Sequence, residues 1–212
     1  MIPLALRIRK EAHRQIAKAQ DIIVETLYEV FDYAVFHGGT CIWRCYQGNR
    51  FSEDIDVYLK RDVEKINEFF KNLEKKGFEI LKKKIGENSI YSSLRFDRIE
   101  VRFEALFKNV KGELRDYESI ESNKILVYAL SPESLISEKV STYLKRRKIR
   151  DLYDIFFLSK KVSNTKDIKP ELVRLMKDYK EPIDESDLQV IILEGLVPKS
   201  NDIIKHIKNI AA

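Results

Sequence analysis

The run Asp54–Leu59 carries two carboxylates, and no other segment limits the fold and chemistry of this chain as strongly. Its pattern predicts a β-strand, on which residues two apart project from the same face, so Asp54 and Asp56 are expected side by side. Two like charges at that distance are unfavourable unless a cation lies between them or one carboxylate is protonated. We therefore predict a divalent metal at this pair, Mg²⁺ or Mn²⁺, because oxygen atoms are the ligands that Mg²⁺ prefers.

A Gly-Gly-Thr turn ends a short apolar run upstream of the carboxylate strand. Glycine lets backbone amides approach a ligand closely, and the turn is expected to open a short helix. Amide groups at the start of a helix bind phosphate well. An arginine and a serine between the turn and the strand add a cation and a hydroxyl. The predicted phosphate-binding and nucleotide-binding residues are Gly38, Gly39, Thr40, Arg50 and Ser52.

The turn and the carboxylate strand together predict metal-assisted phosphoryl or nucleotidyl transfer. Each part alone is a weak signal, because a glycine pair is usually only a turn and an Asp-x-Asp is often a solvated strand edge or a helix cap. The joint pattern is more informative, since apolar residues follow both carboxylates, as a half-buried strand requires.

The pattern Gly-Gly-Thr followed by Arg-Phe-Ser-x-Asp-Ile-Asp resembles the nucleotidyltransferase superfamily of the DNA polymerase beta type. Within that superfamily, the chain is similar to the AbiEii family of toxins, which includes the MenT toxins. A second block, Ser131–Lys139 followed by Arg147–Ile155, resembles the family's lysine-bearing helix and the Arg-Asp-x-x-Asp helix after it. The resemblance covers roughly residues 20 to 160.

This resemblance implies a metal-dependent enzyme that moves a nucleoside monophosphate from a nucleoside triphosphate (NTP) to an acceptor hydroxyl. It implies that the acceptor is RNA, specifically a tRNA end, and that the protein is a toxin with an antitoxin partner. Two alternatives stay open: an acceptor hydroxyl on a small molecule or a protein, and a non-catalytic protein that binds nucleic acid or a partner and has kept only the fold. The intact pair Asp54 and Asp56 argues against the non-catalytic alternative.

In the second block, the resemblance implies functions for a lysine and two aspartates. Lys139 would neutralise triphosphate charge, and we expect it and Asp154 to be catalytic together with Asp54 and Asp56. Asp151 is expected to bind the nucleotide. Because Asp151 and Asp154 are three apart, they share a helix face and would orient the lysine or a base, or simply cap the helix.

The superfamily's third metal-binding carboxylate lies on a strand next to the carboxylate pair. Apolar and charged residues alternate from Ile99 to Glu104, which predicts a half-buried strand with a polar face. We take Glu100 as the candidate and Glu104 as the reserve. Alternating Glu and Arg also occurs on ordinary exposed strands, so the number of metals stays open.

The net charge of +5 permits nucleic acid as a partner without requiring it. The basic run Lys145–Arg150 would follow an RNA backbone, or alternatively would form a solvated turn between helices. The first residues do not have the pattern of a secretory signal, and no apolar run approaches a membrane span. We therefore expect a cytoplasmic protein with no membrane partner.

The order of patterns predicts an α/β (α+β) fold, in which a small mixed sheet carries the carboxylate pair and a helical domain follows. The N-terminal helix is expected to begin with a solvated basic cluster, and Ser131 with Pro132 marks a later helix start. The domains are therefore 1–130, a nucleotidyltransferase-like α/β domain with an N-terminal helix, and 131–212, a helical domain. The expected elements are helices at 7–33 and 62–76, strands at 78–84, 89–96, 98–107 and 125–130, and a polar loop at 110–124.

Overall fold

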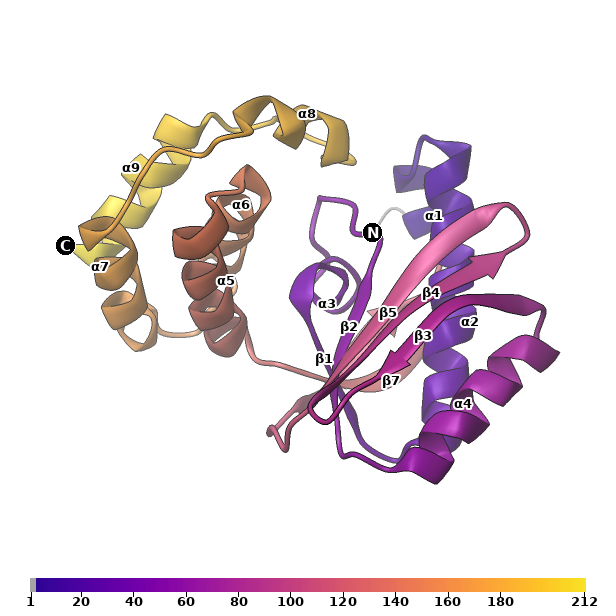
Figure 1. The fold of residues 1–212 in the computed structure, drawn as a ribbon. Coiled ribbons are helices and arrows are strands. Elements are labelled where there is room, and N and C mark those ends of the chain that lie inside the picture. The colour runs from indigo at the N-terminus through magenta and orange to yellow at the C-terminus, as the bar shows by residue number, and fades with distance from the viewer. Residues whose placement is uncertain (1–2) are drawn as a thin grey trace. The chain divides into compact units, whose positions relative to one another are not determined.

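The computed structural model describes residues 3–212, which divide into two compact units. One unit ends at Leu130 and combines a β-sheet with helices, and the other, Ser131–Ala212, is helical (Figure 1). This confirms the predicted fold class, a mixed α/β protein with a helical C-terminal part.

A seven-stranded sheet in the order β3-β4-β5-β2-β1-β7-β6 forms the centre of the first unit. Strand β2 lies in the middle, parallel to β5 and antiparallel to β1, and β1 is in turn parallel to β7. Antiparallel pairs complete both ends of the sheet. The strands are β1 Ala34–His37, β2 Ile55–Leu59, β3 Phe78–Ile85, β4 Ser89–Phe96, β5 Ile99–Phe107, β6 Glu113–Glu118 and β7 Lys124–Ala129.

Two helices, α2 (Glu11–Val30) and α4 (Val63–Lys75), pack against each other and against one face of the sheet (Figure 1). The rings of Phe69 and Phe70 in α4 lie 4.8 and 6.4 Å, between centroids, from the ring of Phe103 in β5. Because successive strand residues face opposite sides, the neighbours of Phe103 project from the opposite face of the sheet, which we call the open face.

The N-terminal helix is interrupted, contrary to the prediction of one helix from residue 7. A short helix, α1 (Leu4–Arg7), precedes α2. The expected solvated cluster is also wrong for Arg7, which is buried and donates hydrogen bonds to the carbonyl of Gly48 at 3.2 Å and to Oδ1 of Asn49 at 3.0 Å. Arg7 thereby holds the loop that leads to the carboxylate strand.

Strand β6 corrects the prediction of a loop at residues 110–124. It pairs antiparallel with β7 at the edge of the sheet. Only Leu114 and Tyr117 are apolar or aromatic in it, and Leu114 is exposed, so the sequence has little alternation there. An edge strand needs only one covered side and tolerates such a polar pattern.

A buried ion pair attaches α3 (Gly38–Cys45) to the rest of the first unit. The guanidinium of Arg44 is paired with Asp21 of α2 and lies 4.6 and 4.7 Å from the ring centroids of Trp43 and Tyr117. The same carboxylate accepts hydrogen bonds from the Tyr117 hydroxyl at 3.0 Å and from the amide of Ile120 at 2.7 Å. One aspartate therefore joins α2, α3 and the segment of β6.

The second unit consists of helices, and the first of them begins where the sequence predicted. Ser131 caps α5, since its hydroxyl accepts a hydrogen bond from the amide of Ser134 at 3.3 Å, and Pro132 occupies the first position. Within residues 3–212, no helix is long and apolar enough to cross a membrane. The helices are α5 Pro132–Arg146, α6 Ile149–Leu158, α7 Lys169–Lys177, α8 Leu188–Ile191 and α9 Ser200–Ala211.

Asp21→Asn is expected to lower the free energy of unfolding by about 3–5 kcal/mol, because it leaves the buried charge of Arg44 without its counter-ion. Chemical denaturation of the purified protein measures this change. The matched control is Asp32→Asn, which removes an exposed partner of Lys65 and should leave stability nearly unchanged. Equal effects of the two substitutions would contradict the anchoring role of Asp21.

Candidate functional site

The open face of the sheet places Asp56 between side chains from two neighbouring strands. The register sets Asp56 opposite Glu104 of the parallel strand β5 and opposite His37 of the antiparallel strand β1. Neighbouring strands lie about 4.8 Å apart, so these three residues form one row across the sheet. All three are half-buried, which leaves the row accessible from the open face.

Asp54 lies next to this row, and its carboxylate is held by an arginine from β5. The Arg102 guanidinium donates two parallel hydrogen bonds, from Nε to Oδ1 and from Nη2 to Oδ2, each 2.8 Å long. Such a bidentate pair is a strong and directional interaction. In this structure, Arg102 therefore provides the positive charge that compensates Asp54.

Burial and the neighbouring carboxylates determine the direction in which the pKa of Glu104 is shifted. Burial raises the pKa of Glu104, and the negative charges of Asp56 and Asp54 raise it further, while Arg102 and His37 oppose the shift. Three carboxylates are thus close enough that full ionisation of all of them is unfavourable. A cation bound among them would relieve this repulsion.

The donor atoms of this cluster fit a divalent metal in chemical type. Asp54, Asp56 and Glu104 offer carboxylate oxygens, which Mg²⁺ and Mn²⁺ both accept. Within the described residues, however, no group of three or more His, Cys, Asp or Glu side chains is arranged to hold a metal ion. Arg102 engages both oxygens of Asp54, so a metal ligated by Asp54 would have to displace that guanidinium.

The geometry favours Glu104, named above as the reserve, over Glu100 as the partner of the aspartates. Glu100 lies opposite Arg95 of β4, beyond the part of β5 that pairs with β2, and accepts a hydrogen bond from Ser93. At about 3.3 Å per residue, it is about 13 Å along the strand from Glu104. A metal held by Asp56 is out of reach of Glu100 at that distance.

The glycine turn approaches the carboxylates so closely that other residues do not fit. Gly38 has φ +70°, and a Cβ atom there would overlap Oδ2 of Asp56. A Cβ atom at Gly39 would overlap the hydroxyl of Ser52 and lie 2.6 Å from Nη2 of Arg50. The structure therefore brings these predicted phosphate-binding residues together with Asp56.

The start of α3 offers backbone amides to a ligand. The amides of the first turn of a helix have no partner within the helix, and the capping residue, His37, gives them no side-chain hydrogen bond. The hydroxyl of Thr40 does not face a ligand, although Thr40 was predicted to bind phosphate. Its side chain is fully buried, and its hydroxyl donates to the carbonyl of Asp54. Its hydroxyl therefore positions the carboxylate strand, which leaves its backbone amide for the phosphate role.

Gln20 is a site-supporting residue that the sequence did not indicate. It lies in the buried stripe of α2, and its Nε2 donates to the carbonyls of Ser52 at 2.9 Å and Glu53 at 3.0 Å. These bonds fix the backbone just before the carboxylate strand. The only signal in the sequence was a polar residue on an otherwise apolar helix face.

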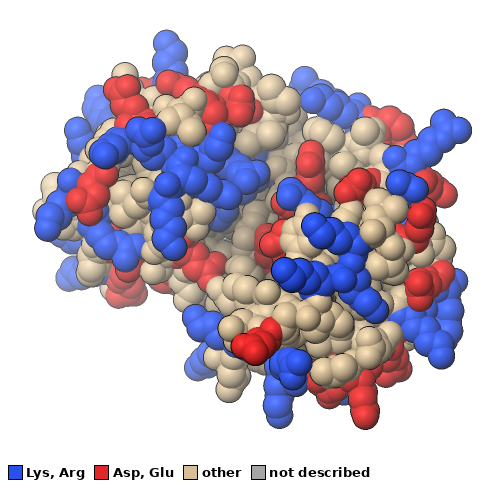
Figure 2. Space-filling model, viewed as in Figure 1, with Lys and Arg blue, Asp and Glu red and all other residues tan. Residues whose placement is uncertain are grey.

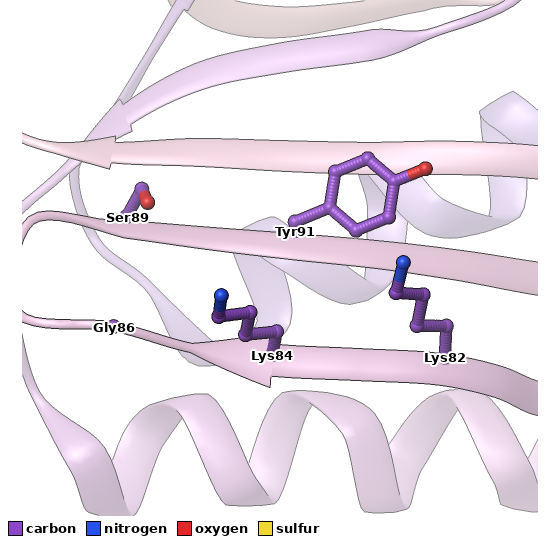
Figure 3. Close-up of a pocket in the computed structure, with 5 residues that line it drawn as sticks. All are labelled: Lys82, Lys84, Gly86, Ser89 and Tyr91. Carbon is purple, nitrogen blue, oxygen red and sulfur yellow. The ribbon is translucent and has the colours of Figure 1, made fainter.

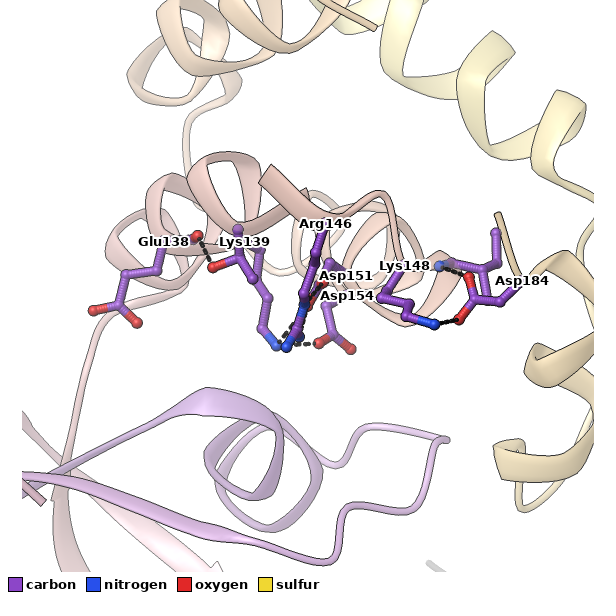
Figure 4. Close-up of polar contacts among 9 residues, drawn as sticks. Glu138, Lys139, Arg146, Lys148, Asp151, Asp154 and Asp184 are labelled. Atoms are coloured by element: carbon purple, nitrogen blue, oxygen red, sulfur yellow. Dashed lines mark hydrogen bonds and ion pairs between the residues drawn. The ribbon is translucent and has the colours of Figure 1, made fainter. Parts of the chain in front are cut away.

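The three predicted residues of the second unit form one buried cluster (Figure 4). Nζ of Lys139 in α5 lies 2.7 Å from Oδ2 of Asp154 and 3.3 Å from Oδ1 of Asp151, both in α6. Arg146 donates to both oxygens of Asp151 at 2.7 and 2.8 Å. Both aspartates are fully buried, so their charges require these partners.

The basic run Lys145–Arg150 is partly engaged within the fold. Arg146 pairs with Asp151, as described, and Lys148 lies 3.4 Å from Asp184, whose other oxygen accepts from a backbone amide of α6. For Arg146 and Lys148, these contacts favour the second interpretation of the run, a turn between helices, over an RNA-binding segment. In the space-filling view, Lys and Arg side chains still predominate on the visible face of the helical unit (Figure 2).

Comparison with known proteins gives one family and several structural relatives. The sequence model of a family described as "Nucleotidyl transferase AbiEii toxin, Type IV TA system" matches residues 22–203. No match was found among curated proteins.

Three solved structures share the fold across nearly the whole chain. MenT4, a nucleotidyltransferase toxin from Mycobacterium tuberculosis, is 18% identical with a TM-score of 0.68, covering 100% of this chain and 89% of that one. JHP933 from Helicobacter pylori is 18% identical with a TM-score of 0.64, covering 96% and 91%. A putative nucleotidyltransferase from H. pylori is 18% identical with a TM-score of 0.65, covering 96% and 94%.

Gly39→Ala is expected to weaken NTP binding by about tenfold to a hundredfold, since the methyl group would displace the hydroxyl of Ser52 and the guanidinium of Arg50. Isothermal calorimetry with each NTP measures this loss. Gly86→Ala is the control, because a methyl group there lies at an ordinary 3.6 Å from the carbonyl of Ser89. Unchanged NTP binding in Gly39→Ala would remove the turn from the nucleotide site.

Proposed function

The chain belongs to the AbiEii family of nucleotidyl transferase toxins, and from this premise we propose that it transfers a nucleoside monophosphate from an NTP to a hydroxyl at a tRNA end. Family and fold support a nucleotidyltransferase in a toxin role. We further propose an antitoxin as its protein partner. The observation that carries the proposed chemistry is the carboxylate row of Asp56 and Glu104 beside the glycine turn of α3.

The phosphates of the NTP are held at the start of α3 in this proposal. The amides of Gly38, Gly39 and Thr40 donate to phosphate oxygens there, as helix N-termini do. Ser52 adds a hydroxyl, and Arg50 adds a charge that stabilises the transition state. The buried Arg50 is fixed in part by its hydrogen bond to the carbonyl of Phe51 at 3.1 Å, so it is positioned before the substrate arrives.

Asp54, Asp56 and Glu104 would hold Mg²⁺ or Mn²⁺. When bound, the metal neutralises the charge that develops on the reacting phosphate. The acceptor oxygen forms a bond to the α-phosphorus in line with the bond to pyrophosphate, which breaks as pyrophosphate leaves. The hydroxyl proton passes to the Glu104 carboxylate in this proposal.

The cluster of the second unit supplies a fixed cation in this proposal. Asp154 holds the amino group of Lys139 at 2.7 Å, while Arg146 compensates the charge of Asp151. Lys139 then neutralises phosphate charge during transfer, and the two aspartates position it. This assignment makes Asp151 a positioning residue rather than a direct ligand of the nucleotide.

Asp56→Asn should abolish transfer, and Glu104→Gln should lower kcat by about two orders of magnitude. Each change removes a carboxylate that would hold the metal, and the metal in turn stabilises the negative charge of the transition state. The assay incubates the protein with each α-labelled NTP, total RNA and Mg²⁺ and follows label incorporation. Glu100→Gln is the control on the same strand and should retain activity. Full turnover in Asp56→Asn would contradict the site, and an equal loss in Glu100→Gln would contradict the choice of Glu104.

Lys139→Ala should lower kcat by about two orders of magnitude or more, as the loss of one preorganised charge does. The exposed Lys145→Ala is the control and should bind the NTP normally. Because a buried aspartate without its cation destabilises the fold, the double variant Lys139→Met with Asp154→Asn removes both charges together. A double variant that is folded by circular dichroism yet fully active would show that the pair is only structural.

A further inference from the structure

The edge strand β3 contains a β-bulge that decides which face its lysines occupy. Before the bulge, Ile80 lies opposite the buried Leu94 of β4, and after it, Lys82 lies opposite Ser93. The additional residue, Leu81, shifts the alternation by one position, and such a shift moves the following side chains to the other face. With regular pairing, Lys82 would have faced the helix-covered side of the sheet.

The ring contacts of the lysines agree with this change of face. Nζ of Lys83 lies 5.0 Å from the ring centroid of Phe70, which belongs to the covering helix α4. Nζ of Lys82 lies 4.9 Å from the ring centroid of Tyr91, on the opposite, open face. Lys82 and Lys84 therefore project from the open face, whereas Lys83 projects from the helix-covered face.

The strand register continues the carboxylate row as far as β3. Lys84 lies opposite Tyr91 of β4, Tyr91 opposite Glu104 of β5, and Glu104 opposite Asp56 of β2. With about 4.8 Å between strands, Tyr91 is about 5 Å and Lys84 about 10 Å from Glu104. The ring of Tyr91 is thus one strand away from Glu104, and the ammonium-bearing Lys84 is two strands away.

These residues line an open pocket of about 350 Å³ on β3 and β4 (Figure 3). Both lysine side chains rise from β3 toward the strand that carries the ring of Tyr91. The residues that line the pocket are Lys82, Lys84, Gly86, Ser89 and Tyr91, all within the described part of the chain, and no carboxylate is among them. The pocket therefore presents positive charge and one aromatic face.

We propose that this β3–β4 pocket binds the terminal nucleotide of the acceptor, a single-stranded RNA end, with its base on Tyr91 and its phosphates beside Lys82 and Lys84. Aromatic rings flanked by cations bind single-stranded nucleic acid in this way, with little dependence on base sequence. This inference rests on the proposed nucleotidyl transfer and names where the second substrate lies.

The position of the pocket matches the geometry of the reaction. The glycine turn follows β1, so the NTP phosphates lie at the β1 end of the row, whereas the pocket lies at the β3 end. Attacking and leaving oxygens are roughly in line across the transferred phosphorus, so the two substrates approach from opposite sides. The pocket therefore lies at the β3 end of the row, opposite the NTP phosphates, which is the side from which the acceptor approaches.

The test measures binding of a fluorescein-labelled single-stranded RNA oligonucleotide with a free 3′ hydroxyl, by fluorescence anisotropy over a range of salt. The variant Lys82→Gln with Lys84→Gln should weaken binding and flatten the slope of log K against log salt by about 0.7 for each phosphate that the lysines no longer neutralise. Lys83→Gln, which removes one positive charge of the same strand from the other face, should bind like the wild type.

Tyr91→Ala should weaken RNA binding about tenfold or more, whereas Tyr91→Phe keeps the stacking surface and should bind normally. NTP binding by calorimetry should be unchanged in every one of these variants. Equal losses in Lys83→Gln and the double variant, or equal losses in both Tyr91 variants, would overturn the proposal. No RNA binding by the wild type would also overturn it, in favour of a small-molecule or protein acceptor.

Binding needs no turnover, so failure of this inference is separable from failure of the proposed function. If the wild type labels RNA but the pocket variants keep its KM for RNA, the pocket is not the acceptor site and nucleotidyl transfer stands. If RNA binding depends on the pocket but the wild type transfers no label, the pocket is supported as an RNA site and the proposed function is contradicted.

Discussion

The register of β2 against its two neighbours determines where every charged group of the carboxylate row lies. It places Asp56 beside Glu104 and His37 and leaves Asp54 to the guanidinium of Arg102. A slip of one residue would turn Asp56 toward the covering helices and disperse the cluster. Burial and the neighbouring carboxylates raise the pKa of Glu104, which is the physical reason that this face of the sheet favours a cation.

Buried charge pairs hold elements in place in both units. Arg44 and Asp21 attach α3, the helix that opens with the glycine turn, to α2, and Lys139 with Asp154 joins α5 to α6. Each pair costs desolvation and is therefore weak evidence for stability in itself. What the pairs provide is a fixed position for a helix start and for an ammonium group, and fixed dipoles and charges are what phosphate transfer requires.

Sequence alone predicted the local features of this fold, and the errors concern long-range pairing. Sequence patterns predicted the strands from β3 to β5, and capping residues predicted the start of α5 at Ser131. Glu100 and Glu104 share a strand face, so only the pairing of β5 with β2 distinguishes them. The bulge at Leu81 and the burial of Arg7 depend likewise on partners that lie far away in the sequence.

Metal binding by the carboxylate row can be observed by anomalous diffraction at the manganese edge, from crystals grown with Mn²⁺ and a non-hydrolysable NTP. We expect an anomalous peak at the carboxylates of Asp54, Asp56 and Glu104, with the phosphates at the start of α3 and Arg102 displaced from Asp54. A peak coordinated by Glu100, or a bound nucleotide whose phosphates lie away from Gly38 and Gly39, would contradict this assignment.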